Sequence, residues 1–120
     1  PEICFDVTTI TKDWGHEIEW NIGGSTHASC ENEQRYENDQ EYTQQCCLPA
    51  DHDEFAITCK DTYGDGWHGG YLEIEGEQYC VDFSNGDEFA DTLPNPNPEP
   101  EGCLFRLHIL FIILIMIYMT

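Results

Sequence analysis

Seven cysteines in a chain of 120 residues constrain this protein more than any other feature of its sequence. Apolar residues make up 40% of the chain, but 14 of them lie between residues 104 and 119, so little remains for a core before that point. Small domains with thin cores are commonly stabilised by disulfides in an oxidising compartment. No Cys-x-x-Cys pair is present, and no cysteine and histidine set has zinc-finger spacing. We therefore predict a disulfide framework and an extracellular, secreted or cell-surface location.

The cysteine spacing indicates three disulfides and one cysteine left over. Cys59 and Cys80 flank a loop and the first strand of a predicted hairpin, which makes them partners if the neighbouring strands pair. Cys46 and Cys47 are adjacent, and a bond between them would close a strained ring, so each is expected to reach a separate partner. The remaining pairing stays open. The expected disulfide residues are Cys4, Cys30, Cys46, Cys47, Cys59 and Cys80, and Cys103 is expected to be unpaired or joined to another chain.

The charge is strongly negative, at −20 with neutral histidines. All 24 acidic residues lie at or before Glu101, and Lys12, Arg35 and Lys60 are the bases in that region. Such a surface repels nucleic acid and anionic lipid headgroups, so we expect no nucleic-acid partner and no membrane contact except through the C-terminal tail. It favours divalent cations or cationic polymers, or it simply keeps the protein soluble.

Alternating apolar residues predict strands in three regions of the chain. Residues 2–23 form two such runs, interrupted at residues 12–16, and residues 55–60 form a third. Residues 71–83 have the pattern of a hairpin with a turn near Gly76. The pattern and the turn spacing predict an all-β fold, a small antiparallel β-sandwich stabilised by disulfides. The alternating residues are Ile3, Phe5, Val7, Ile18, Trp20, Ile22, Leu72, Ile74, Tyr79, Val81 and Phe83.

The other segments lack this pattern. Residues 23–54 are polar and long, and we expect irregular structure held by disulfides, with room for a short helical turn at residues 38–45. The disulfide-stabilised β domain is then expected to cover residues 1–90. Prolines at every second position from Pro94 to Pro100 predict a Pro-rich acidic spacer over residues 91–103, with no sheet or helix through residues 93–102.

Residues 104–120 form an apolar tail that differs from everything before it. A helix that spans a bilayer needs about 20 apolar residues, and this run is too short to span comfortably. Three interpretations are open: the cleaved tail of a lipid-anchor signal, a strand that pairs with a neighbouring copy, or an artefact of an incomplete gene prediction. If the tail is retained, we expect other copies of the chain to cover it.

The loop after residue 60 combines acids and glycines in the way that calcium sites do. Calcium takes about six to eight oxygen ligands, and short loops supply them from carboxylates and backbone carbonyls. Glycines allow such carbonyls to turn inward. The predicted calcium ligands are Asp61, Gly64 and Asp65 in the loop, with Glu73 or Glu75 on the next strand, or Asp82 beyond it, completing the shell. The alternative is a glycine-rich turn in which the two loop aspartates accept hydrogen bonds from backbone N–H groups.

Aromatic residues in and beside this loop suggest a ligand surface. Tyr63, Trp67, His68 and Tyr71 are the candidate ligand-binding residues. Aromatic faces near a calcium loop would suit stacking on sugar rings. In so small a domain, core filling is the alternative for Trp67, and an exposed loop histidine without a role is the alternative for His68.

The motif Asp-x-Tyr-Gly-Asp-Gly-Trp-x-Gly-Gly at residues 61–70, followed by a strand and Tyr79-Cys80, resembles a short motif of secreted, cysteine-rich β-modules. Such modules occur in surface proteins of protists and marine invertebrates and in some bacterial exported proteins. The segment from Asn38 to Pro49, with the following strand into residues 58–61, is similar to part of the same module. The resemblance covers roughly residues 3–86. It implies an extracellular location and β-structure, and it supplies no activity.

These observations favour an extracellular or cell-surface module that acts in binding and structural assembly, with calcium as its expected cofactor. We expect no enzyme, because the sequence has no Gly-x-Ser-x-Gly motif and oxidised cysteines offer no nucleophile. The expected partners are other copies of the chain, extracellular matrix components or glycans. Two alternatives stay open: a calcium-dependent carbohydrate-binding module, and a self-assembling subunit of an extracellular fibre or coat.

Overall fold

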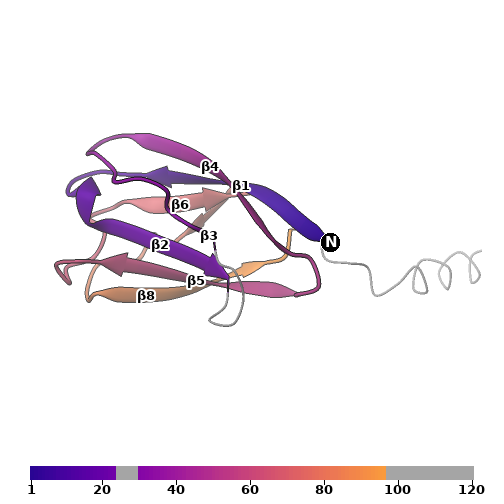
Figure 1. Cartoon of the computed structure of the whole chain (residues 1–120). Coiled ribbons are helices and arrows are strands. Elements are labelled where there is room, and N and C mark those ends of the chain that lie inside the picture. The colour runs from indigo at the N-terminus through magenta and orange to yellow at the C-terminus, as the bar shows by residue number, and fades with distance from the viewer. Residues whose placement is uncertain (24–29, 97–120) are drawn as a thin grey trace, which may run out of the picture.

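The protein is a β-sandwich of two four-stranded antiparallel sheets. The structure, a computed structural model, describes residues 1–23 and 30–96. One sheet has the strand order β4-β1-β6-β7 and the other β3-β2-β5-β8, and the two lie as layers over one another (Figure 1). The elements are β1 (Glu2–Ile10), the 3-10 helix η1 (Gly15–Glu17), β2 (Ile18–Gly23), β3 (Cys30–Glu31), β4 (Glu41–Pro49), β5 (Glu54–Asp61), β6 (Tyr71–Ile74), β7 (Glu77–Tyr79) and β8 (Glu88–Pro94).

Alternation places one face of each central strand in the core, as the sequence predicts. Along β1 and β2 every second side chain is buried, and the same holds along β5 and β6. The two inner faces meet in one apolar cluster, so the predicted all-β sandwich is confirmed. The fully buried side chains of this cluster include Val7, Trp20, Ile22, Ile57, Leu72 and Ile74.

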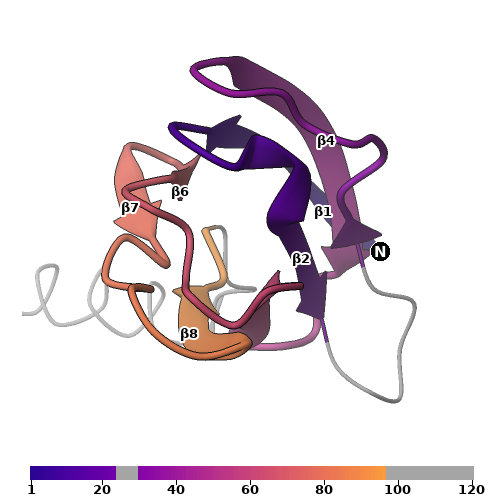
Figure 2. The same cartoon turned by 90° about the vertical axis from the view of Figure 1, so that its left-hand side faces the viewer.

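The connections bring two loops to the same end of the sandwich. β1 and β5 both finish at the end opposite the N-terminus (Figure 1), and Figure 2 views the sandwich from that end. The chain crosses from one sheet to the other after β1, through η1, and returns to the first sheet after β5, through residues 62–70. Residues 11–17 and 62–70 therefore lie together, and they are called the loop end below.

Three disulfides link the described part of the chain. Cys59 is joined to Cys80, the pair that the sequence favours, and this bond connects β5 of one sheet to the residue after β7 of the other. Cys4 is joined to Cys47, directly opposite it in the β1–β4 register. The third bond joins Cys30 to Cys46, so the adjacent cysteines have separate partners as predicted. Three disulfides in so short a chain indicate an oxidising environment.

The expected irregular segment contains a long strand instead. β4 pairs with β1 over all nine of its residues, so the prediction of irregular structure is wrong there, and so is the helical turn at residues 38–45. β4 is an edge strand whose outer face is polar, and only Cys46 and Leu48 on it are fully buried. Polar residues, among them Thr43, Gln44 and Gln45, fill most of the other positions, so the apolar alternation that reveals a strand is weak here.

The folded domain also extends further than expected. β8 pairs with β5 through Pro94, although the sequence predicted a domain end at residue 90 and no sheet from residue 93. Pro94 is tolerated because β8 is an edge strand, where a missing N–H breaks no central ladder. Asn95 is buried and donates hydrogen bonds to the carbonyl oxygens of Asp53, Ala50 and His52. The domain therefore continues at least to Asn95.

The predicted hairpin at residues 71–83 is correct in its first part only. β6 and β7 pair around a turn at Glu75 and Gly76. β7 ends at Tyr79 because Cys80 has a φ of +57°, which turns the chain away from the sheet. Val81 is consequently 44% exposed and not a core residue, whereas Phe83 returns to the core.

Several predictions fall outside the described residues. Cys103, the remainder of the spacer and the apolar tail at residues 104–120 all lie beyond residue 96. Within residues 1–23 and 30–96, no helix is long and apolar enough to cross a membrane.

Candidate metal centre

The Asp-Gly-rich segment forms a tight turn built around one buried carboxylate. Asp61 ends β5 and is 2% exposed. Its Oδ1 accepts a hydrogen bond from the N–H of Tyr63 at 3.2 Å, and its Oδ2 accepts one from the N–H of Asp65 at 2.7 Å. Both oxygens thus accept backbone hydrogen bonds within the turn. This is the alternative to a calcium ligand that the sequence also allowed for Asp61. The predicted ligand Gly64 is likewise engaged, because its carbonyl oxygen accepts from the N–H of Gly86.

Glycine is required at residue 66 for both conformation and space. Its φ is +83°, and a Cβ there would lie 2.6 Å from the carbonyl oxygen of Phe83. That oxygen accepts the hydrogen bond from the N–H of Trp67 at 2.9 Å, which ties the turn to the chain after β7. Gly64 has a similar φ of +77°, but a Cβ there would meet nothing within 4 Å.

These two glycines allow a matched test of why the loop is so rich in glycine. Gly64→Ala is expected to lower the free energy of unfolding by about 1–2 kcal/mol, the cost of a side chain in the left-handed region. Gly66→Ala is expected to cost at least about 2 kcal/mol more, because the clash with the Phe83 carbonyl adds to the same conformational cost. Urea denaturation of the two variants measures the difference, and equal losses would contradict the steric role of Gly66.

Trp67 is a core residue and not part of a ligand surface. It is 1% exposed, its ring packs against Phe83, and its Nε1 donates to the carbonyl oxygen of Lys60 at 2.9 Å. Its predicted role in ligand binding is therefore wrong. Trp67 fills the core instead, which is the alternative that the sequence also allowed. Burial of this large ring also anchors the turn from beneath.

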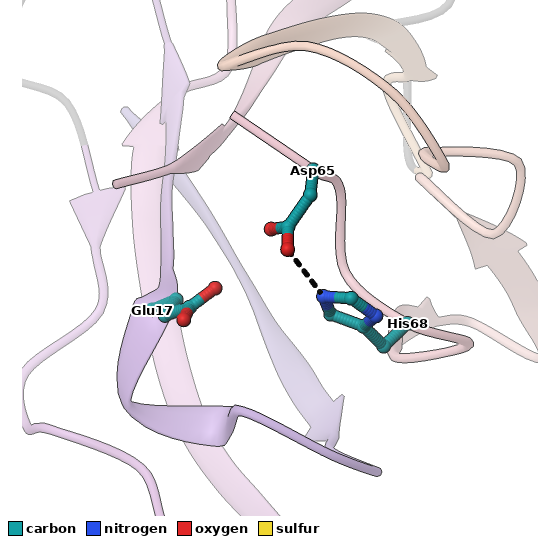
Figure 3. A group of neighbouring side chains, drawn as sticks. All are labelled: Glu17, Asp65 and His68. Carbon is teal, nitrogen blue, oxygen red and sulfur yellow. Dashed lines mark ion pairs between the residues drawn. The ribbon is translucent and has the colours of Figure 1, made fainter. Parts of the chain in front are cut away.

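Three potential metal ligands converge at the loop end. Glu17 comes from η1, and Asp65 and His68 come from the loop after β5 (Figure 3). One ligand atom from each lies within 4.8 Å of the other two. His68 Nε2 is 3.2 Å from Asp65 Oδ2. Figure 3 shows the carboxyl group of Glu17 directed toward the other two side chains. This is a possible metal site of two acids and one imidazole, and it includes Asp65 from the predicted calcium set.

Burial sets the protonation of the acids at this site. Burial raises the pKa of Glu17, and the hydrogen bond and negative charge of the neighbouring Asp61 carboxyl raise it further. Burial alone would also raise the pKa of Asp61, but its hydrogen bonds with Asp65, Tyr63 and Glu17 outweigh burial and lower that pKa. Of the two, Glu17 is therefore the acid that takes up a proton more readily, and a bound cation would compete with protonation of Glu17.

Exposed aromatic residues flank the three ligands. Trp14 is 52% exposed and its ring centroid lies 6.5 Å from that of His68 and 6.1 Å from that of His16. Tyr63 is 74% exposed and lies on the turn that carries Asp65. An open groove of about 590 Å³ borders this end, and its lining includes His16, Glu19, Asn32, Glu33, Gln34, Arg35 and Tyr63.

The other predicted site residues lie elsewhere. Glu73 is exposed on β6, where it pairs with Thr8 and Gln78, and Asp82 is exposed after β7. Neither belongs to the group formed by Glu17, Asp65 and His68. Tyr71 is half-buried at the start of β6, opposite Ile10. Of the predicted ligand-binding residues, Tyr63 and His68 are therefore the ones that the fold places beside the possible metal site.

Glu17 is the potential metal ligand that could not be found from the sequence. It stands between the break at residues 12–16 and an apolar strand, where an acid is expected to be solvated. The available signal was its position in the short connection between the first two strands. In a β-sandwich of antiparallel strands, that connection lies at the same end as the loop after β5.

No family model, curated protein or solved structure matches this chain.

Proposed function

We propose that this protein is an extracellular or cell-surface, non-catalytic module that acts in binding and structural assembly, with a divalent cation stabilising its loop end. Its partners on this proposal are extracellular matrix components, glycans or other copies of the chain. The three disulfides support an extracellular setting. The group of Glu17, Asp65 and His68 supports a bound cation.

One observation carries the assignment of the loop end as the binding face. Among the described residues, three large hydrophobic side chains are exposed, namely Trp14, Tyr63 and Val81, and the first two flank the possible metal site. Exposed aromatic residues beside a charged site offer both contact area and direction to a ligand. The cation would hold the two loops that carry them, since Glu17 belongs to one loop and Asp65 to the other.

Calcium is the cation that the sequence predicts, and the net charge of −20 supports uptake of a divalent cation in general. The cluster itself offers two carboxyl groups to such an ion. The imidazole of His68 is the one donor of the three that calcium does not favour.

A binding experiment tests the proposal on the full chain. The oxidised protein is applied to immobilised glycans and immobilised extracellular matrix proteins, with and without EDTA. We expect binding that EDTA abolishes and that Trp14→Ala or Tyr63→Ala weakens at least about tenfold, as loss of an aromatic anchor does. Val81→Ala, which removes an exposed side chain outside the loop end, is the control and should bind as the unaltered protein does. Binding that neither EDTA nor the aromatic variants change would place the interaction elsewhere and contradict the proposal.

A carbohydrate-binding module is the second candidate, and the groove beside the site supports it. Amide, carboxyl and guanidinium groups line this groove next to the exposed ring of Tyr63. Sugars are bound by such a combination of hydrogen-bonding groups and an aromatic face. Selective, EDTA-sensitive retention on particular glycans would favour this candidate, and retention on matrix proteins alone would favour the general proposal.

The third candidate, a self-assembling subunit of a fibre or coat, depends on a different part of the chain. It depends on Cys103 and on residues 104–120, which lie outside the described residues. Ordered polymers of the protein expressed alone would support it.

A further inference from the structure

We propose that the ion bound by Glu17, Asp65 and His68 is a transition-metal ion of the zinc class, and not calcium, with at least one coordination position open to solvent. This inference rests on the proposed function, because it names the ion that the loop end would take. It differs from the sequence-based expectation in both the ion and the ligands, since Glu17 and His68 replace Asp61, Gly64, Glu73 and Asp82.

The donor atoms select the ion. Calcium is a hard cation that takes about six to eight oxygen ligands and rarely binds nitrogen. This cluster offers one imidazole nitrogen and two carboxyl groups, and the carboxylate oxygens of Asp61, a predicted calcium ligand, already accept backbone hydrogen bonds. Zinc and its neighbours bind imidazole together with carboxylate and need only about four ligands.

The spacing of the donors fits a tetrahedral ion. Zinc lies about 2.0–2.2 Å from nitrogen and oxygen ligands, so two ligands of a tetrahedral site are roughly 3.3–3.6 Å apart. His68 Nε2 and Asp65 Oδ2 are 3.2 Å apart, close to that separation. The Glu17 oxygen lies within 4.8 Å of both and needs only a small side-chain movement to complete the third edge.

Glu17 supplies an independent indication of a ligand. Its side chain is 7% exposed, and its Oε2 has no hydrogen-bond partner, which is costly for a buried carboxyl oxygen. The group points toward Asp65 and His68 (Figure 3). A cation held between the three side chains and bound through Oε2 would give this oxygen a partner.

The backbone holds the ligands in place before any ion binds. The N–H of Glu17 donates to the carbonyl oxygen of Trp14 and closes η1, and the N–H of Asp65 donates to the buried Asp61 carboxylate. Asp61 is thus a positioning residue for Asp65. His68 has a φ of +52° and follows the buried Trp67, which anchors this part of the loop. Such preorganisation lowers the cost of assembling the site.

Three protein ligands leave a tetrahedral ion one further position. The side chains of Asp65 and His68 are 55% and 29% exposed, so that position opens to solvent beside Trp14. Zinc sites with three protein ligands keep such a position for water or for a donor atom of a bound molecule. A ligand of this module would bind there through a carboxylate, hydroxyl or imidazole group.

The test compares ions and a histidine variant on the metal-free, oxidised full chain. Zinc at a hundredfold excess over its dissociation constant is expected to raise the Tm by roughly 10 °C, whereas calcium and magnesium are expected to leave it nearly unchanged. His68→Asn is the decisive variant. Asparagine tolerates the positive φ at this position and replaces the imidazole nitrogen by an oxygen that calcium accepts and zinc disfavours. It should lower zinc affinity at least about 100-fold, measured by titration calorimetry.

Two further variants separate a ligand from a merely structural residue. Glu17→Gln should abolish the zinc-induced rise in Tm while leaving the metal-free Tm unchanged or higher, because a neutral amide is easier to bury than a carboxyl group without a full set of partners. Asp65→Asn should likewise weaken zinc binding. Asp82→Asn, which removes an equal charge outside the cluster, is the control and should bind zinc as the unaltered protein does.

The outcomes distinguish the identity of the ion from the proposed cation-stabilised function. Stabilisation by zinc that His68→Asn removes supports the inference. Stabilisation by calcium that His68→Asn preserves overturns it, and the proposed cation-stabilised function stands. Stabilisation by no ion overturns both the inference and the cation in the proposed function. Zinc binding that Asp82→Asn weakens as much as Asp65→Asn does would show general attraction to the acidic surface, and it would also overturn the inference.

Discussion

Replacement of Cys59 and Cys80 together by alanine is expected to lower the free energy of unfolding by about 3 kcal/mol. The bond closes a loop with a sequence separation of 21, and its removal restores that much chain entropy to the unfolded state. Both cysteines are essentially fully buried in the core between the sheets. Alanine avoids burying a hydroxyl group, so the measured loss reflects the cross-link and the small cavity. Urea denaturation under oxidising conditions measures it.

The comparison pair for this variant is Cys4 and Cys47. That bond joins neighbouring strands of one sheet, whereas Cys59–Cys80 is a covalent link from β5 to the chain beyond β7 in the other sheet. Loss of Cys59–Cys80 should therefore loosen the packing of the two sheets and broaden the amide spectrum of β7 and β8, and loss of Cys4–Cys47 should not. A Cys59→Ala/Cys80→Ala variant as stable as the unaltered protein would contradict the dependence of this thin core on disulfides.

Trp20→Ala is expected to cost about 3–5 kcal/mol, the usual range for removal of a fully buried large aromatic side chain. Trp20 is 1% exposed on β2, and its Nε1 donates to Thr9 Oγ1 at 3.1 Å and to the hydroxyl of Tyr36 at 3.0 Å. Thr9 lies on β1 of the opposite sheet, so one side chain connects both sheets through apolar packing and a buried polar network. A loss of this size is a large part of the stability of a domain of this length, typically about 5–15 kcal/mol.

Two further variants separate the contributions of Trp20. Trp20→Phe keeps most of the buried ring but removes the N–H that donates to Thr9 and Tyr36, and about 1–3 kcal/mol should be lost. Trp14→Ala, at an exposed position, should change the free energy of unfolding by no more than about 0.5 kcal/mol. Thermal and urea denaturation of the three proteins check the order. Equal losses for Trp20→Ala and Trp14→Ala would contradict the core that the fold defines.

The central strands could be predicted because their apolar residues alternate with charged ones. Ile18, Trp20 and Ile22 are the clearest case, and their period of two is direct evidence for a half-buried strand. β4 escaped prediction because an edge strand needs few apolar residues, and its Gln44 and Gln45 resemble a polar loop. The end of β8 was not predicted because Pro94 suggests the end of a sheet. Proline is nevertheless compatible with an edge strand such as β8.

The candidate site was predictable only where its residues are local in sequence. Asp65 and His68 lie in one loop whose composition stands out, so both were candidates from the sequence, Asp65 as a calcium ligand and His68 as a ligand-binding residue. Glu17 lies 48 residues before Asp65, and only the three-dimensional crossing of the chain between the sheets brings it to them. The burial that leaves its Oε2 without a partner is a tertiary property with no local signal. The same holds for Asp61, whose position suggested a metal ligand but whose oxygens are used by the turn.

A crystal structure of the zinc-loaded protein, with anomalous data collected at the zinc absorption edge, tests the central claim most directly. We predict one anomalous peak at the loop end, about 2.0–2.2 Å from His68 Nε2 and from a carboxylate oxygen of Asp65 and of Glu17, with a solvent-facing fourth ligand beside Trp14. An anomalous peak that lacks Glu17 or His68 as a ligand, or no peak at this end of the sandwich, would contradict the account.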